Sequence, residues 1–301
     1  MLKNFIRYLK IDYKLLLSLL IRCILARLIT IFVLLNIFFI LGRMYNKYFW
    51  NKLKDKWIVI TGCTDGIGKE IAIQLAKRKF KLCLLARNKD KLNELANSLR
   101  DNENIKEIVF DLNNDVPQDL FDDLPEIGLL INNAGVSLDF PDFFEDSNVK
   151  EIVKINVLTT SLLTKLAIKK MKKGNVIFVS SILAENTAPL LSAYSASKAY
   201  IKHLSESLSY ENNVHSEVVF PGYVCTKMSK IRKPSLFVPS AKDFAASLIK
   251  TIGFSRVTIP YYPHLLINFV YTSIPSWVFG NVLIRKLLNV RKIALKKKKS
   301  S

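Results

Sequence analysis

The sequence predicts an α/β fold in which a parallel sheet is doubly wound, with helices on both of its faces. Between residues 57 and 255, short apolar runs alternate with longer segments that have helical spacing, which is typical of repeated strand–helix–strand units. A glycine-rich turn, residues 61–68, joins the first apolar run to the first helical segment. Polar residues follow several later runs, and the carboxyl ends of parallel strands are where such sheets bind ligands.

The first unit is a strand, a turn and a helix. Residues 57–60 form the apolar run, and apolar residues recur at helical spacing from Ile71. The glycines of the turn let the backbone approach a pyrophosphate, and the helix N-terminus supplies free N–H groups and a positive dipole end. The cofactor-binding residues expected in this turn are Gly62, Thr64, Asp65, Gly66, Ile67 and Gly68.

The end of the second strand, residues 81–86, indicates which dinucleotide is bound. An acid at this position would accept a hydrogen bond from a ribose 2′-hydroxyl, whereas a guanidinium would bind a 2′-phosphate. The sequence offers Arg87 and Lys89, and the nearest acid, Asp90, comes later. This favours NADP(H) over NAD(H), and a solvated basic turn is the alternative interpretation.

Two further strands run into polar residues. A strand over residues 105–110 is followed by Asp111, which is well placed for an adenine amino group. A strand over residues 127–131 runs into Asn-Asn-Ala-Gly at 132–135. A polar turn in this position is where open α/β sheets bind ligand. A long helical pattern at 147–173 and a strand at 215–220 complete the alternation.

Tyr194 and Lys198 are four residues apart, so they fall on one face of a helix that is predicted to reach about residue 212. Ser181 follows the apolar run at 176–179. A positive charge beside a phenol favours the phenolate, so we expect the pKa of Tyr194 to fall from its usual ~10 towards neutrality. A general acid works well in that range. Taken alone, the pair is also typical of an ordinary helix surface.

Neither a metal site nor a disulfide framework is expected. Cys23, Cys63, Cys83 and Cys225 show no C-x-x-C spacing, and the three histidines are scattered.

The positive charge of the chain is concentrated at its two ends. Residues 1–56 hold eleven Lys or Arg and two Asp, and residues 285–301 hold eight Lys or Arg and no acid. Residues 57–284 are nearly balanced, with 26 basic and 23 acidic residues. A nucleic-acid-binding protein usually carries its charge across the working face of the fold. Basic flanks beside apolar segments favour a membrane surface with anionic lipid instead, so nucleic acid is not expected as a partner.

Two apolar segments lie next to these flanks. Residues 15–42 are almost wholly apolar, and the window 24–42 supplies nineteen residues with one charge, Arg27. A spanning helix needs ~20 residues, so we expect a retained anchor, with a membrane-surface helix as the alternative. Residues 259–284 are again apolar, rich in aromatic side chains and interrupted by proline. We expect this second segment to re-enter the membrane or to lie in its interface.

Several of these features, taken together, resemble the motif set of the short-chain dehydrogenase/reductase family, in family order. They are residues 61–68, residues 132–135, Asn156, Ser181, Tyr194-x-x-x-Lys198 and residues 221–226. Further matches look like its microsomal very-long-chain 3-oxoacyl-CoA reductase branch, also called the 17β-hydroxysteroid dehydrogenase type. They are residues 64–69, 125–128, 230–234 and 274–277. The family fold is a Rossmann-like sheet, here expected over residues 57–255.

The resemblance implies a catalytic tetrad. Tyr194 would give its proton to the developing alkoxide, and Ser181 would donate a hydrogen bond to the same substrate oxygen. Lys198 would lower the pKa of Tyr194 and bond the nicotinamide ribose. Asn156 would hold a water that relays the replacement proton.

The resemblance also implies contacts with NADPH. Arg87 would hold the 2′-phosphate, Asp111 the adenine, and Asn133 would contact the ribose region. Val224 and Thr226 would hold the carboxamide end. After Thr226 the chain is basic, and we hypothesise that the cations of residues 227–233 meet the phosphates of coenzyme A; a solvated loop is the alternative.

Three functions are compatible with these residues. The first is reduction of 3-oxoacyl-CoA in very-long-chain fatty-acid elongation, with other elongation enzymes as partners. The second is reduction of a steroid or another apolar ketone, and the third is a membrane scaffold without catalysis. The C-terminal lysines, Lys298 and Lys299, resemble a dilysine retrieval signal, which implies the endoplasmic reticulum membrane with the catalytic domain facing the cytosol. A homo-oligomer is compatible with the sequence.

The expected organisation has three parts. Residues 1–56 are the anchor and a basic linker, residues 57–255 the NADP-binding domain, and residues 256–301 a membrane-associated segment with a basic tail.

Overall fold

The structure is a computed structural model. It describes residues 17, 18, 22, 42, 44–99, 101, 103–211 and 214–299. The chain divides into two units, Met1–Lys47 and Tyr48–Ser301, and the fold described below is that of the second. Most of the expected anchor, residues 15–42, lies outside the described residues.

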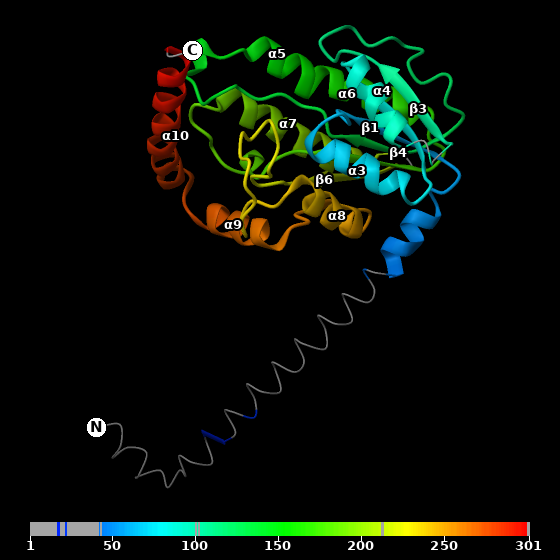
Figure 1. The fold of residues 1–301 in the computed structure, drawn as a ribbon. Helices are drawn as coiled ribbons and strands as arrows, with labels where there is room; N and C mark the ends of the chain where they lie inside the picture. The colour runs from blue at the N-terminus through cyan, green and yellow to red at the C-terminus, as the bar shows by residue number, and fades with distance from the viewer. Residues whose placement is uncertain are drawn as a thin grey trace. The chain divides into compact units, whose positions relative to one another are not determined.

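The second unit is built on a seven-stranded parallel sheet in the order β3-β2-β1-β4-β5-β6-β7 (Figure 1). The strands are β1 (Trp57–Thr61), β2 (Lys81–Ala86), β3 (Ile105–Val109), β4 (Ile127–Asn132), β5 (Gly174–Val179), β6 (Val214–Val219) and β7 (Val257–Thr258). The chain crosses over between β3 and β4, so β1 has β2 on one side and β4 on the other. The carboxyl ends of these strands flank the switch point where doubly wound sheets bind ligands. The expected α/β class is confirmed.

Helices cover both faces of the sheet (Figure 1). They are α3 (Gly66–Ala76), α4 (Lys89–Ser98), α5 (Val149–Val153), α6 (Thr160–Lys169), α7 (Ser192–Leu208), α8 (Ala241–Thr251), α9 (Tyr262–Ser273) and α10 (Ser276–Lys299). Ile58 and Ile60 pack in the same apolar cluster as α3 and α8, whereas Val59 packs in the cluster that contains α6 and α7. Both faces of β1 are therefore buried, which explains its continuous apolar run.

The helical pattern at 147–173 forms one helical segment with a π-helical turn, Lys154–Thr159, between α5 and α6. Asn156 lies in this turn and is buried. Single π-turns inside helices are frequent at functional sites because they re-aim a side chain.

The packing of the domain extends beyond residues 57–255 at both ends. Trp50 is buried and donates from Nε1 to the carbonyl of Ile249 (3.0 Å). Phe49 packs on Gly253, whose φ of +89° and missing side chain both suit the contact, since a Cβ there would lie 2.4 Å from the ring. At the other end, β7 pairs with β6 and widens the sheet.

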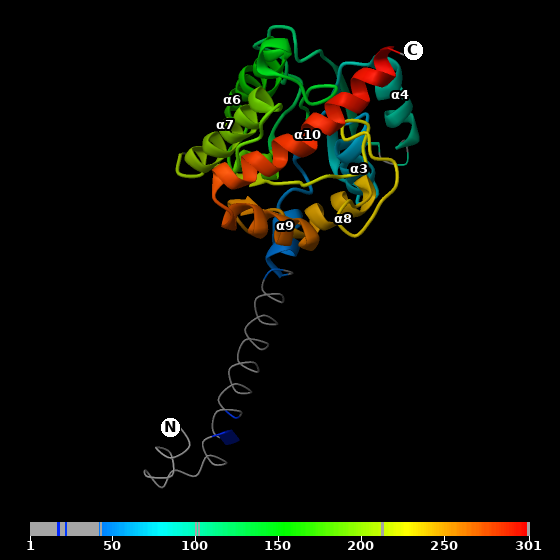
Figure 2. The same cartoon turned by 90° about the vertical axis from the view of Figure 1, so that its left-hand side faces the viewer.

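The last two helices are joined at Ile274 and Pro275. Proline has no N–H to donate and cannot continue a helix, which explains the break. Among the described residues, no single helix is long and apolar enough to cross a membrane, but α9 and α10 together, bent by 118°, have the necessary length and composition. Helix α10 crosses the front of the domain (Figure 2). Leu287 packs on residues 188–191, and Arg291 pairs with Asp142 (2.6 Å).

Candidate active site

A cavity of about 560 Å³ opens at the carboxyl edge of the sheet. The predicted site residues that line it are Gly62, Thr64, Asp65, Gly66, Ile67, Arg87, Asp111, Asn133, Ser181, Tyr194, Lys198, Val224 and Thr226. Gly68 and Asn156 are not among the lining residues, but both contact residues that are. The topology therefore brings segments far apart in the sequence to one site.

The glycine-rich turn forms one end of the cavity. Gly62 and Gly66 have φ values of +64° and +55°, in the left-handed region that favours glycine. A Cβ on Gly68 would lie 2.5 Å from the carbonyl oxygen of Gly62 and 2.4 Å from the Asn133 amide, so Gly68 serves the close packing of the turn. A Cβ on Gly66 would lie 3.1 Å from Thr226, across the cavity wall. The turn is therefore a cradle that side chains would fill, which fits a pyrophosphate at the start of α3.

Asn133 joins the ends of β1 and β4 beside this turn. Its Nδ2 donates to the carbonyls of Thr61 (3.0 Å) and Gly62 (3.1 Å). In return, the Thr61 hydroxyl accepts from the backbone N–H groups of Asn133 (3.1 Å) and Ala134 (3.0 Å). The polar turn that the sequence predicted is thus a clamp that holds the cradle in shape, while Asn133 still lines the cavity.

Cations gather near the end of β2. Arg87 lines the cavity as predicted, but Lys89 does not, and Lys91, which sequence reasoning missed, does. Asn88 caps α4 by accepting from the N–H of Lys91 (2.8 Å), which sets the register of the helix. The Asn before the helical pattern is the capping signal in the sequence, and it identifies Lys91 as the third residue of the helix.

Asp65 is a carboxylate that lies between two of the lysines that line the cavity, Lys91 and Lys227. Its Oδ2 accepts from Lys227 (2.9 Å) and Lys91 (3.3 Å). Burial raises the pKa of Asp65, but the hydrogen bonds from Lys227 and Lys91 outweigh it and lower the pKa. Asp111 is engaged as well, since its Oδ1 accepts from the N–H of Asn113 (2.9 Å).

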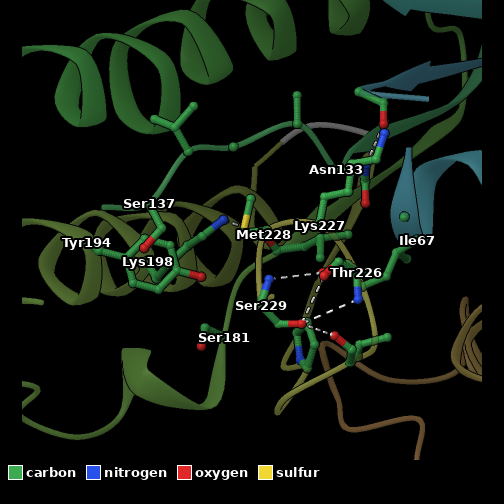
Figure 3. A pocket seen from close by; sticks show the side chains of 18 of the residues that line it. Ile67, Asn133, Ser137, Ser181, Tyr194, Lys198, Thr226, Lys227, Met228 and Ser229 are labelled. Carbon is green, nitrogen blue, oxygen red and sulfur yellow. Dashed lines mark hydrogen bonds between the residues drawn. The ribbon is translucent and has the colours of Figure 1, made fainter. Parts of the chain in front are cut away.

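Tyr194 and Lys198 reach into the cavity from α7, and Ser181 faces the same space (Figure 3). The Lys198 Nζ lies 5.8 Å from the centroid of the Tyr194 ring and donates to the carbonyl of Val179 (2.9 Å). The Ser180 hydroxyl donates to the carbonyl of Lys198 (2.8 Å) and so ties α7 to the end of β5. The predicted pair therefore lies on one face of a helix, and the end of the neighbouring strand holds its lysine in position.

The expectation that the pKa of Tyr194 falls is wrong for this structure. Burial raises its pKa to about 12, although a hydrogen bond with Ser181 lowers it in part. Burial also lowers the pKa of Lys198 to about 8. The physical reason is that burial removes the phenolate from water, and this cost exceeds the stabilisation by the Ser181 hydrogen bond.

Asn156 links the loop after β4 to α7. Its Oδ1 accepts from the N–H of Val136 (2.8 Å), and its Nδ2 donates to the carbonyl of Val136 (2.9 Å) and to the Ser197 hydroxyl (3.0 Å). A Cβ on Gly135 would lie 3.2 Å from both Asn156 Oδ1 and Lys198 Nζ. Gly135 therefore leaves the space between these two polar groups open.

A family model described as "short chain dehydrogenase" matches residues 56–235. The chain belongs to the short-chain dehydrogenase family. Rat, mouse and human proteins named "Very-long-chain 3-oxoacyl-CoA reductase" are 34%, 35% and 34% identical to it. The rat match covers 85% of this chain and 87% of the relative, and the mouse and human matches each cover 82% and 84%. The resemblance to that branch is confirmed.

Solved structures of the family share the fold. A putative short chain dehydrogenase from Escherichia coli CFT073, complexed with NADPH, has a TM-score of 0.62 at 22% identity, over 69% of this chain and 96% of that one. A short-chain dehydrogenase from Sphingobium yanoikuyae, in complex with NADPH, has a TM-score of 0.59 at 25% identity, over 68% and 87%.

In this short-chain dehydrogenase the C-terminal helices supply an apolar wall whose residues were not individually predicted from the sequence. Ile267 and Tyr271 of α9 and Leu283 and Leu287 of α10 line the cavity, together with Lys286. Each apolar pair has the spacing of one helical turn, a signal that the sequence carries. The cavity therefore continues from Tyr194 into an apolar compartment.

The histidine of α9, His264, ties this wall to the loop after β6. His264 is buried, and its Nδ1 accepts from the N–H of Gly222 (3.1 Å). Its Nε2 lies 3.1 Å from the carbonyl of Tyr223 and 3.3 Å from that of Phe237. An acceptor at Nδ1 and carbonyls at Nε2 fit the neutral tautomer with its proton on Nε2. This structural role of His264 was not predicted from the sequence.

Proposed function

We propose that this chain reduces 3-oxoacyl-CoA to 3-hydroxyacyl-CoA with NADPH in very-long-chain fatty-acid elongation. The observation that carries the proposal is a cavity in which Tyr194, Lys198 and Ser181 meet both the glycine cradle and an apolar wall from α9 and α10. The names of the rat, mouse and human relatives support the substrate class. An apolar compartment beside the acid is what a long acyl chain requires.

The residues at the carboxyl edge fit NADPH. The cradle at residues 62–68 would hold the pyrophosphate, and Arg87 would hold the 2′-phosphate, with Lys91 beside it. Val224 and Thr226 would contact the carboxamide end. When bound, NADPH supplies the hydride for the ketone carbon.

The proton comes from Tyr194. Its high pKa keeps the phenol protonated at neutral pH, so the proton is available for the substrate oxygen. Ser181 donates a hydrogen bond to the same oxygen, which stabilises the charge that develops there. The Lys198 ammonium stabilises the phenolate as the proton leaves. Asn156, next to Lys198, holds a water that returns a proton to the tyrosine.

We extend the proposal to the endoplasmic reticulum membrane, with the catalytic domain facing the cytosol. The support is the apolar composition of residues 15–42, the basic flanks and the C-terminal lysines Lys298 and Lys299. Exposed apolar side chains on α9 and α10 add to it, and these include Tyr262, Leu266, Phe269 and Trp277. In this proposal α9 lies in the interface and admits acyl chains from the bilayer. Other elongation enzymes are the proposed partners. The proposed NADP-binding part, residues 57–255, lies between residues 1–56 and 256–301, and both of these parts contribute packing to it.

The substrate class is tested by assaying the purified full chain with NADPH against a long-chain 3-oxoacyl-CoA and a 17-ketosteroid. We expect a kcat/KM at least about a hundredfold higher for the acyl-CoA, because the acyl chain and the coenzyme A part both contribute binding energy. A higher kcat/KM for the steroid than for the acyl-CoA would contradict the proposal and favour a steroid reductase. No NADPH oxidation with any ketone would favour a scaffold.

A further inference from the structure

A second cleft, of about 760 Å³, lies beside the catalytic cavity. Two segments far apart in the sequence form it, the loop after β6 and the end of α10. Its lining residues are Cys225, Thr226, Lys227, Lys230, Ile231, Arg232 and Lys297. Thr226 and Lys227 also line the catalytic cavity, so the two spaces share a wall.

The lining of this cleft is strongly cationic. It contains Lys227, Lys230, Arg232 and Lys297 and no acid. Lys227 pairs with Asp65 (2.9 Å), and Lys230 lies 3.9 Å from the carboxylate of Asp139, with both of these side chains largely exposed. Exposed pairs of this kind are weak. A concave lining that carries several cations and no acid concentrates positive potential and attracts polyanions.

Arg232 is the cation best placed for phosphate recognition. It forms no ion pair within the part of the chain that the structure describes, and it lines the cleft opposite the end of α10. A guanidinium can bind a phosphate with two parallel hydrogen bonds, whereas an ammonium such as that of Lys297 acts as a point charge.

The phosphates of NADPH have their own cradle, at residues 62–68 and Arg87. The substrate of the proposed function brings a second set, because coenzyme A carries a pyrophosphate and a ribose phosphate at the end remote from its thioester. We infer that the second cleft binds these phosphates, with Arg232 and Lys297 as the main contacts. The acyl chain then lies against Ile267 and Leu283. This inference rests on the proposed function and adds to it the site that recognises coenzyme A.

The test compares wild type with the double variant Arg232→Gln/Lys297→Gln. Matched controls are Lys233→Gln, the next residue of the loop, and Lys292→Gln, on the same helix, neither of which lines the cleft. The substrates are a long-chain 3-oxoacyl-CoA and the same acyl group as an N-acetylcysteamine thioester, which has no phosphate. We expect the double variant to raise KM for the acyl-CoA at least about tenfold, because charged hydrogen bonds are lost. In the double variant, the KM for the phosphate-free thioester and the Kd of NADPH stay unchanged. In the two control variants, all of these constants stay at their wild-type values.

Three results of this comparison would overturn the inference, and calorimetry adds a fourth. They are an unchanged KM for the acyl-CoA, an equal rise for both thioesters, and a matching rise in the Kd of NADPH, which would assign the cleft to the cofactor. Calorimetry with free coenzyme A separates the inference from the proposed function. If the double variant binds coenzyme A more weakly than wild type, but wild type does not reduce 3-oxoacyl-CoA, the inference stands and only the proposed function is contradicted. No binding of coenzyme A to wild type would overturn the inference.

Discussion

Burial decides the protonation state of the proposed acid, Tyr194. With a pKa raised to about 12, the phenol holds its proton throughout the physiological range. Such a phenol is a weak acid, so its proton leaves only if its neighbours stabilise the phenolate. Ser181 and Lys198 are the neighbours that can do this. Burial also lowers the pKa of Lys198 to about 8, so its ammonium releases a proton more readily than that of an exposed lysine. The three residues therefore act as one unit.

Arg87 is the residue proposed to select NADPH over NADH. Arg87→Gln removes the guanidinium proposed to bind the 2′-phosphate, so we expect the Kd of NADPH to rise at least about tenfold. The Kd of NADH stays unchanged, because NADH has no 2′-phosphate. Fluorescence titration of the two dinucleotides measures both constants. Lys89→Gln is the matched control, since Lys89 does not line the cavity. A similar loss for both dinucleotides would contradict the assignment.

Helix α9 lies between the exposed surface of the domain and the catalytic cavity. One of its faces carries exposed apolar residues such as Phe269, and another supplies Ile267 and Tyr271 to the cavity wall. Its buried His264 accepts a hydrogen bond from the backbone of Gly222, which lies in the loop that carries Val224. A single helix thus contacts both the proposed acyl compartment and the proposed cofactor loop.

The packing of β6 on β7 contains a buried carboxyl group, Glu217. Its Oε2 accepts from the N–H of Gly253 (2.7 Å). Burial raises the pKa of Glu217 from 4.5 to about 7, although hydrogen bonds from Thr258 and Gly253 lower it in part. The folded chain therefore binds this proton more tightly than the unfolded chain. The contribution of Glu217 to stability is fully present below the unfolded pKa and is lost as the pH rises to about 7.

Glu217→Gln removes this titration and keeps a side chain that can accept the same hydrogen bond. We expect the variant to be more stable than wild type by roughly 1–3 kcal/mol at about pH 8, and the difference to shrink towards about pH 5. Urea unfolding at several pH values measures it. Glu94→Gln, at an exposed position on α4, should leave the pH dependence unchanged. A difference between Glu217→Gln and wild type that does not vary with pH would be evidence against the buried proton.

The net positive charge of the molecule is concentrated at the two ends of the chain. The central part, residues 57–284, is nearly neutral, whereas residues 1–56 and 285–301 carry most of the net charge of +20. The cationic end of α10 also lines the second cleft through Lys297. The basic tail therefore serves the proposed coenzyme A site as well as the proposed membrane surface.

The sequence predicted the features that depend on local pattern. Strands β1 to β6 lie within one or two residues of their expected bounds, whereas the short β7 was not expected. The glycine cradle and the Tyr194–Lys198 pair lie where the motifs indicated. It did not predict features that depend on packing between distant segments. The wall from α9 and α10 requires Leu287 to meet residues 188–191. The direction of the pKa shift at Tyr194 requires its burial, which neighbouring residues in the sequence do not reveal.

Tyr194 is the proposed acid for a ketone bound beside NADPH. Tyr194→Phe removes one hydroxyl and keeps the buried ring, so the most direct test of this role is NADPH consumption with a long-chain 3-oxoacyl-CoA. We expect kcat to fall by a factor on the order of a thousand, with the Kd of NADPH within about twofold of wild type. A variant that binds NADPH normally and keeps a substantial fraction of wild-type turnover would contradict the claim.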